Sequence, residues 1–260
     1  MLHVPNDNRL TPTDIAILTE NYRFTETNLP ASPYSISSKD LLCGEQCRQY
    51  LQTISPIFNS TSLIITASLF GKRYSVLTMA TPLFAMSMLQ KGINMSIDNV
   101  RVESSYQEDL WLPKIALVDA QVILPISRAE WRDQILQSLF ADNMTKVWKA
   151  LSTTAKVSKA VLWEHAAMYV HWFYETQFRQ GASEREIAFL EEDYQYIMTE
   201  APGEIFGERK NPFTRYNTPK VMTRGTDKPI RLRKTCCYYY LTSEEEHDYC
   251  ISCPKMPNVK

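Results

Sequence analysis

The sequence predicts an α+β fold that is mainly helical, with a small antiparallel sheet in the middle and a small cysteine-rich segment at the C-terminus. Three observations lead to this prediction. Glycine is scarce, with 7 residues among 260, which favours long helices. Apolar and polar residues alternate between about residues 93 and 124, which is typical of strands. Four of the six cysteines lie in the last 25 residues.

The composition is that of an ordinary globular protein. With 44% hydrophobic and 22% charged residues, the chain can bury one substantial core or two modest ones. A formal net charge of −1 gives no overall attraction for nucleic acid or anionic lipid. We expect a mixed α+β scaffold domain over residues 1–201, and a linker with a C-terminal metal-binding segment over residues 202–260.

The N-terminal third predicts a series of helices. Residues 14–21 form a short helix, and Ser38 or Asp40 can cap a second helix that runs to Leu51. Two further helices are predicted over residues 59–70 and 74–90, with a kink or a new start at Pro82.

A change of periodicity predicts the sheet. Ile93, Met95 and Ile97 alternate with polar residues, Asp98-Asn99 supplies a turn, and the alternation resumes over residues 100–102, which predicts a hairpin. Residues 110–113 and 115–124 continue the pattern. A sheet of three or four strands follows from it.

The second half of the chain returns to helices. Ser127 with Glu130 has the pattern of a capping box, and further helix starts are predicted at Asp142-Asn143, at Ser158 and at Ser183 with Glu186. Four consecutive helices ending near Ala201 are the result. Residues 202–234 are rich in Pro, Gly, Asn and charge, which predicts a linker or an extended strap.

Cellular location decides how the cysteines are interpreted. Residues 1–18 lack the basic start, apolar core and cleavage site of a secretion signal, so we expect a cytoplasmic protein. The apolar stretch 63–89 is interrupted by Lys72 and Arg73 and predicts buried helices, with no transmembrane span. In a reducing cytoplasm, clustered cysteines favour metal or redox chemistry over disulfides.

The four C-terminal cysteines, Cys236, Cys237, Cys250 and Cys253, predict a soft-metal centre. The CxxC turn directs two sulfurs to one side, whereas adjacent cysteines need an unusual backbone to bind a single tetrahedral ion. A two-iron cluster spreads its ligands over two metal ions, so it suits this set better than zinc. Zinc, and four unrelated thiols, remain as alternatives.

Side chains near these cysteines are candidates for binding an anionic chelate with an organic backbone. Arg231, Arg233 and Lys234 precede the first pair, and Tyr238 and Tyr239 follow it. Solvated cations and packing aromatics are the structural alternative. The acidic run at 244–248 is expected to face solvent.

Two other features of the sequence have competing interpretations. His165 and His171 could line a pocket, although a helical histidine more often makes a structural hydrogen bond. Cys43 and Cys47 could form a redox pair, but we favour buried small hydrophobic residues and leave them out of the metal centre.

The run IRLRKTCC, a 12-residue loop and CISCP resembles the C-terminal signature of the FhuF-type ferric siderophore reductases. The loop is slightly longer than in the usual family pattern. Upstream, Leu162-Trp-Glu-His-Ala-Ala167 is similar to the LWxNAA-like segment of that family, with His165 in place of the amide, and residues 67–77 resemble its N-terminal helices.

This resemblance implies a cytoplasmic protein with one [2Fe-2S] cluster held by the four cysteines, which passes one electron to the Fe(III) of a siderophore. A hydroxamate or hydroxycarboxylate chelate is the expected substrate. The sequence contains neither a GxGxxG dinucleotide fingerprint nor a P-loop, so a separate protein or reductant must supply the electron. Two alternatives remain, an iron–sulfur redox or iron sensor that acts through a partner protein and a zinc-stapled binding module.

Overall fold

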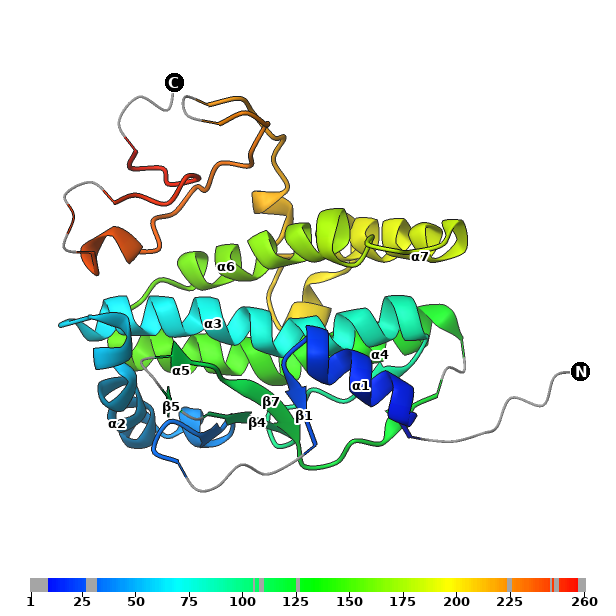
Figure 1. Cartoon of the computed structure of the whole chain (residues 1–260), viewed down its shortest axis with the longest axis horizontal. Helices are drawn as coiled ribbons and strands as arrows, with labels where there is room; N and C mark the ends of the chain where they lie inside the picture. The colour runs from blue at the N-terminus through cyan, green and yellow to red at the C-terminus, as the bar shows by residue number, and fades with distance from the viewer. Residues whose placement is uncertain are drawn as a thin grey trace, which may run out of the picture.

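A computed structural model describes residues 9–26, 32–104, 106–107, 110–124, 127–223, 226–243, 245 and 248–256. Figure 1 shows long helices that lie side by side above a small sheet. The C-terminal segment, coloured orange to red, lies on the far side of the helices from the sheet (Figure 1). The mainly helical α+β fold is therefore confirmed.

The first two predicted helices form, with a change at the start of the second. Helix α1 (Pro12–Asn21) begins with a capping box between Thr11 and Asp14. Ahead of helix α2 (Gly44–Ile54), the predicted cap region forms a short 3₁₀ turn, Asp40–Leu42.

The next two predicted helices are in fact one. Helix α3 (Leu63–Phe84) runs without interruption through Gly71 and Pro82, and it ends in a π-helical turn, Ala85–Leu89. The prediction of a break near residue 72 was wrong, because burial of nearly every face of this helix outweighs the weak helix propensity of glycine. In the described part of the chain, no helix has the length and hydropathy needed to span a membrane.

The main sheet has four short strands in the order β1 (Phe24–Thr25), β7 (Lys114–Leu117), β4 (Val100–Glu103) and β2 (Ile36–Ser37). Only the β1–β7 pair is parallel. Two small antiparallel pairs accompany it, β3 (Gly92–Ile93) with β8 (Val122–Ile123) and β5 (Tyr106–Gln107) with β6 (Leu110–Trp111).

The predicted hairpin around Asp98-Asn99 was wrong. Strand β3 pairs with β8, and strand β4 pairs with β7, so the two halves of the expected hairpin belong to different sheets. The side chain of Asn99 explains the separation. Its amide nitrogen donates to the carbonyl oxygens of Asn94 and Asp119, at 2.7 and 2.9 Å, and so ties this region to the loop after β7. The turn itself forms at residues 97–99, closed by the backbone N–H of Asn99 donating to the carbonyl oxygen of Ser96 at 2.9 Å, but the segments on its two sides do not pair with each other.

The later helices begin at the predicted serines. Ser127, Ser158 and Ser183 are the N-caps of α4 (Arg128–Leu139), α6 (Lys159–Trp172) and α7 (Glu184–Gln195). The predicted start at Asp142-Asn143 lies instead in a π-helical turn, Phe140–Met144, that joins α4 to α5 (Thr145–Ala155). Further π-helical turns, Phe173–Gln177 and Tyr196–Glu200, end α6 and α7.

The first part of the predicted strap packs into the helical core. Phe206 and Phe213 are fully buried, and their rings lie 4.9 and 5.4 Å from the ring of Phe140. The side chain of Asn211 is buried as well and donates to the carbonyl oxygens of Ile197 and Ala201. Residues 203–216 thus share the core of the helices, while the predicted domain boundary near residue 202 stays a prediction.

Gly203 provides a test of this packing. A Cβ atom at this position would lie 2.5 Å from the carbonyl oxygen of Glu208 and 2.6 Å from the amide nitrogen of Lys210. Because both are backbone atoms, Gly203→Ala should lower the free energy of unfolding by about 1–3 kcal/mol in a denaturant titration. Gly44→Ala is the matched control, since the nearest atom to its Cβ is 4.0 Å away. Equal stability of the two variants would contradict the packing described.

Candidate functional site

The four C-terminal thiols gather in one region. Cys237 and Cys253 are buried, and Cys236 and Cys250 are partly buried. The amide of Cys253 donates to the carbonyl oxygen of Cys250 at 2.8 Å, which closes the CxxC turn. The amide of Arg233 donates to the carbonyl oxygen of Ser252 at 3.0 Å, so the chain ahead of the first cysteine pair lies beside this turn.

The backbone at the adjacent cysteines has the unusual conformation that such a pair requires. Tyr238 adopts a left-handed conformation with φ of 65°, which is rare for a residue other than glycine. Its amide lies 3.4 Å from the sulfur of Cys236, and the amide of Tyr239 donates to Cys237. Backbone N–H groups directed at sulfur stabilise thiolates.

The thiols of Cys237 and Cys250 are hydrogen-bonded to each other, which shifts their pKa values in opposite directions. The bond from Cys250 lowers the pKa of Cys237, and burial opposes this effect. The positive charges of Arg233 and Lys72 lower the pKa of Cys237 further. The same bond, together with burial, raises the pKa of Cys250. Of Cys237 and Cys250, Cys237 is therefore the more acidic thiol.

The chemistry of these donors fits a soft metal centre. Four thiols come from one short segment, and two of the sulfurs accept backbone N–H groups. Within the described residues, however, no group of three or more His, Cys, Asp or Glu side chains is arranged closely enough to hold a metal ion. The assignment of the four cysteines as ligands stays a prediction.

A buried carboxylate on α6 holds the segment in place. Glu164, 1% exposed, accepts the backbone N–H groups of Lys234 and Thr235 at 2.5 and 2.8 Å, and the hydroxyl of Thr235 as well. The guanidinium of Arg233 lies 3.5 Å from the same carboxylate. One side chain of the helical body thus fixes the three residues before Cys236.

His165, the next residue on α6, continues this connection. Arg233 donates to its Nδ1 at 3.1 Å, so the ring proton lies on Nε2 and is donated to Ser68 at 3.2 Å. The hydroxyl of Ser68 donates in turn to the carbonyl oxygen of Cys237 at 2.9 Å. Burial, aided by the charges of Arg233 and Lys72, lowers the pKa of His165 well below its usual value. The ring is therefore neutral.

The other predicted binding residues lie in different surroundings. Arg231 forms an ion pair with Glu175 at 3.0 Å, and Lys234 is exposed. Tyr238 is partly buried against the core. His171 makes structural contacts with the hydroxyl of Tyr194 and the carbonyl oxygen of Tyr216.

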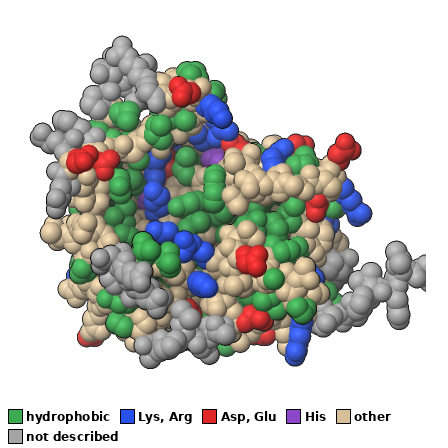
Figure 2. Space-filling view, viewed as in Figure 1, with side chains coloured by type: hydrophobic (Ala, Val, Ile, Leu, Met, Phe, Trp, Pro, Cys, Tyr) green, Lys and Arg blue, Asp and Glu red, His purple; other side chains and the backbone are tan. Residues whose placement is uncertain are grey.

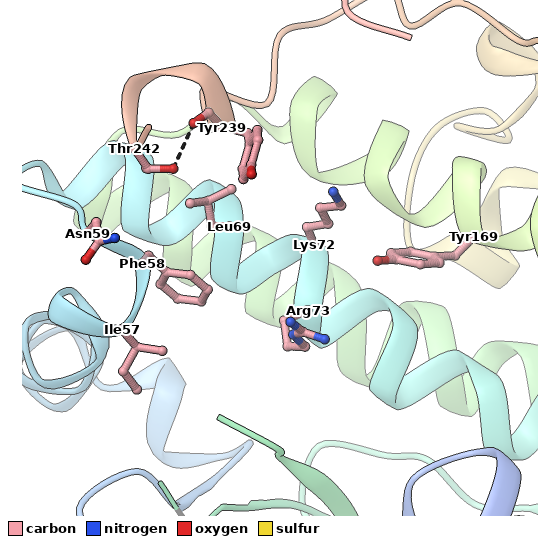
Figure 3. A pocket seen from close by; sticks show the side chains of 9 residues that line it. All are labelled: Ile57, Phe58, Asn59, Leu69, Lys72, Arg73, Tyr169, Tyr239 and Thr242. Carbon is pink, nitrogen blue, oxygen red and sulfur yellow. Dashed lines mark hydrogen bonds between the residues drawn. The ribbon is translucent and has the colours of Figure 1, made fainter. Parts of the chain in front are cut away.

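A cavity of about 360 Å³ lies beside the cysteine segment, and Tyr239 forms part of its wall. The rest of the wall comes from the turn after α2, from α3 and from α6 (Figure 3). Its charged groups are Lys72 and Arg73 of α3, and the hydroxyl of Tyr169 of α6 is directed inward (Figure 3). Asn59 and Thr242 add neutral polar groups. Figure 2 shows basic and hydrophobic side chains together in a hollow of this face.

Lys72 and Arg73 were not among the predicted site residues. The guanidinium of Arg73 lies 6.0 Å from the ring centre of Trp111, and burial lowers its pKa. The signal that could have found them was present in the sequence. A Lys-Arg pair within an otherwise apolar helix requires a polar surrounding, and here that surrounding is the cavity.

The prediction for the N-terminal cysteines is half correct. Cys47 is buried in the hydrophobic core, as expected, whereas Cys43 is exposed. The difference arises because Cys43 is the N-cap of α2 and lies outside the helix that buries Cys47. Of the acidic run that was expected to face solvent, Glu245 is exposed and Asp248 is half-buried, and residues 244, 246 and 247 lie outside the described residues.

These features define a helical α+β protein with a cysteine-rich segment beside a basic cavity. The chain belongs to the family of ferric iron reductase FhuF-like transporters, whose model matches residues 68–223. The matched region includes Lys72, Arg73, Glu164 and His165 and ends before the cysteines. The family's name points to an oxidoreductase that acts on ferric iron. A search of curated proteins gives no match.

Glu164→Gln should weaken the attachment of the cysteine segment. The substitution leaves Arg233 buried without its counter-charge, and breaking a buried ion pair costs about 3–5 kcal/mol of unfolding free energy. Hydrogen exchange at the amides of Lys234 and Thr235 should accelerate. Glu184→Gln, on an exposed surface, is the control. Unchanged protection of these two amides would show that Glu164 does not hold the segment.

His165 should make the stability of the protein sensitive to acid. Its pKa is about 6.5 in an unfolded chain and well below that in the folded protein. Below about pH 6.5 the unfolded state therefore binds a proton that the folded state does not, and the unfolding free energy falls by up to about 1.4 kcal/mol per pH unit.

The control for this pH dependence is the variant His165→Asn, whose side chain keeps a hydrogen-bond acceptor and a donor but does not titrate. Denaturant titrations between pH 7.5 and 5.5 should show that the unfolding free energy of the variant falls less steeply with decreasing pH than that of the wild type. Parallel slopes would mean that His165 takes up a proton in the folded protein.

Proposed function

We propose that this protein is a cytoplasmic ferric-siderophore reductase that releases Fe(II) for use in the cell. The observation that carries the proposal is that the cysteine segment and the basic cavity share a wall. Tyr239 lines the cavity two residues after Cys237, and the charge of Lys72, also in the cavity wall, lowers the pKa of the Cys237 thiol. A substrate in the cavity would thus lie next to the thiols.

Cys236, Cys237, Cys250 and Cys253 would hold a [2Fe-2S] cluster. When bound, such a cluster supplies or accepts a single electron. Support for this set comes from its four thiols, from the N–H groups directed at two sulfurs and from the left-handed backbone after the adjacent pair. Zinc is less suited to adjacent ligands.

The residues of the helical body would fix and tune this centre. Glu164 holds the backbone ahead of Cys236, and the Arg233–His165–Ser68 chain holds the carbonyl of Cys237. Because His165 is neutral and Glu164 is the counter-charge of Arg233, Lys72 supplies the unpaired positive charge that acts on the Cys237 thiol. Positive charges near a thiolate centre favour its more negative, reduced state.

The reaction is the transfer of one electron to the Fe(III) of a siderophore, which becomes Fe(II). Hard oxygen donors such as hydroxamates and hydroxycarboxylates bind Fe(III) much more tightly than Fe(II), so the reduced ion leaves the chelate. The electron must come from a separate low-potential donor, since the chain carries no nucleotide-binding fingerprint.

Purified holoprotein should be red-brown, with equimolar iron and inorganic sulfide and visible absorption that bleaches on addition of dithionite. Cys236→Ser and Cys250→Ser should each lose most of that absorption, because each removes one thiolate ligand. Cys43→Ser is the matched control, since this exposed cysteine lies outside the segment, and its spectrum should equal that of the wild type. Colourless protein with stoichiometric zinc would identify a zinc-stapled binding module instead.

A second measurement separates a reductase from a sensor. The reduced protein, mixed without oxygen with ferric siderophores of hydroxamate and hydroxycarboxylate type, should be reoxidised while a ferrous chelator gains colour. The reoxidised protein and the Fe(II) formed should match one for one. An iron-containing protein that reduces none of these complexes would favour a sensor that acts through a partner.

A further inference from the structure

The charges of the cavity bear on which ferric chelate it accepts. We propose that the cavity selects compact ferric chelates with net negative charge, of the hydroxycarboxylate type, over neutral trihydroxamates. The claim that these chelates are reduced rests on the function proposed above. The claim that the cavity binds anions can be tested by itself.

The first support is that two cations in the cavity wall have no carboxylate partner in the part of the chain that the structure describes. Neither Lys72 nor Arg73 takes part in the ion pairs found among the described residues, and no described carboxylate lines the cavity. Several other cations of the described structure do have carboxylate partners. Arg231 and Lys220 both meet Glu175, for example. A pair of uncompensated cations facing a cavity favours an anionic occupant.

A third cation, Arg233, lies behind the cavity wall with Glu164 as its counter-charge. Arg233 is 7% exposed, and its Nη2 atom has no hydrogen-bond partner in the described structure. Burial raises the pKa of the Tyr169 phenol, and the charges of Arg73 and Arg233 both oppose that rise. The hydroxyl of Tyr169 is directed into the cavity, so the positive charge of Arg73 acts on a group that lines it (Figure 3).

The chemistry of the chelates explains why charge would decide between them. Each hydroxamate carries one negative charge, so three of them balance Fe(III) and leave a neutral complex. Hydroxycarboxylates bring carboxylates and alkoxides in excess of that balance, and their ferric complexes are anionic. A neutral complex would strip water from Lys72 and Arg73 without replacing it, whereas carboxylate oxygens accept charge-assisted hydrogen bonds from both.

The size of the cavity points the same way. At about 360 Å³ it lies near the lower end of the range for small-molecule sites, about 300–1,000 Å³. Phe58 and Tyr239 supply aromatic surface for the organic part of a ligand. A compact chelate can therefore enter far enough to reach the cations.

The test uses the full-length holoprotein and two compact probes that cannot be reduced, gallium(III) citrate and gallium(III) tris-acetohydroxamate. Calorimetry should show at least tenfold tighter binding of the citrate complex, with an affinity that falls as NaCl is added. Lys72→Gln and Arg73→Gln should each weaken citrate binding about tenfold and change hydroxamate binding less than about twofold. Lys149→Gln, an exposed cation on α5, should change neither.

The matching ferric complexes then test the reaction. Anaerobic reduction of ferric citrate should show the same dependence on Lys72 and Arg73, expressed in KM. The proposed selectivity would be overturned if the two gallium complexes bound equally well, or if neither Lys72→Gln nor Arg73→Gln weakened the binding of gallium citrate. Either result would count against it even if the protein reduces ferric complexes. Charge-dependent binding of gallium citrate without any reduction of iron would keep the anion site and refute the reductase function.

Discussion

The buried carboxylate of Glu164 is the interaction on which the arrangement of the site depends. A carboxylate in a protein interior needs hydrogen-bond donors and a counter-charge, and α6 provides neither for this one. Residues 233–235 provide both, through two amides, a hydroxyl and a guanidinium. The position of the cysteines relative to the helices follows from this requirement.

Close packing of α3 against α6 gives the cysteine segment a second point of attachment, besides Glu164. Gly71 permits the approach, because a Cβ atom there would lie 2.4 Å from the Leu162 side chain. As a result Ser68 on α3 and His165 on α6 meet, and together they reach the carbonyl oxygen of Cys237. The same approach places Lys72 near both the cavity and the thiols.

Local signals in the sequence were sufficient to predict most of the helices. Contacts between residues far apart in the sequence could not be predicted in this way. Ser127, Ser158 and Ser183 could be identified as caps because a cap depends on residues within one turn. Strand β4 pairs with residues 36–37, far away in sequence, and no local pattern encodes that contact. The cysteines were visible as a motif, but the contact of Glu164 with Lys234, 70 residues apart, was not. Lys72 and Arg73 excluded a membrane span without revealing the cavity, because their surroundings depend on the fold of distant segments.

The cysteine segment is attached to the helical body partly through its main chain. The amides of residues 234 and 235 and the carbonyl of residue 237 make bonds to α6 and α3, and the side chains of Arg231, Arg233, Thr235 and Tyr238 add further contacts. The main-chain part of this attachment is insensitive to most substitutions, proline excepted, because every other residue carries the same amide. Evolution can thus vary the side chains of the segment, and the length of the loop between the cysteine pairs, while the centre keeps its place on the scaffold.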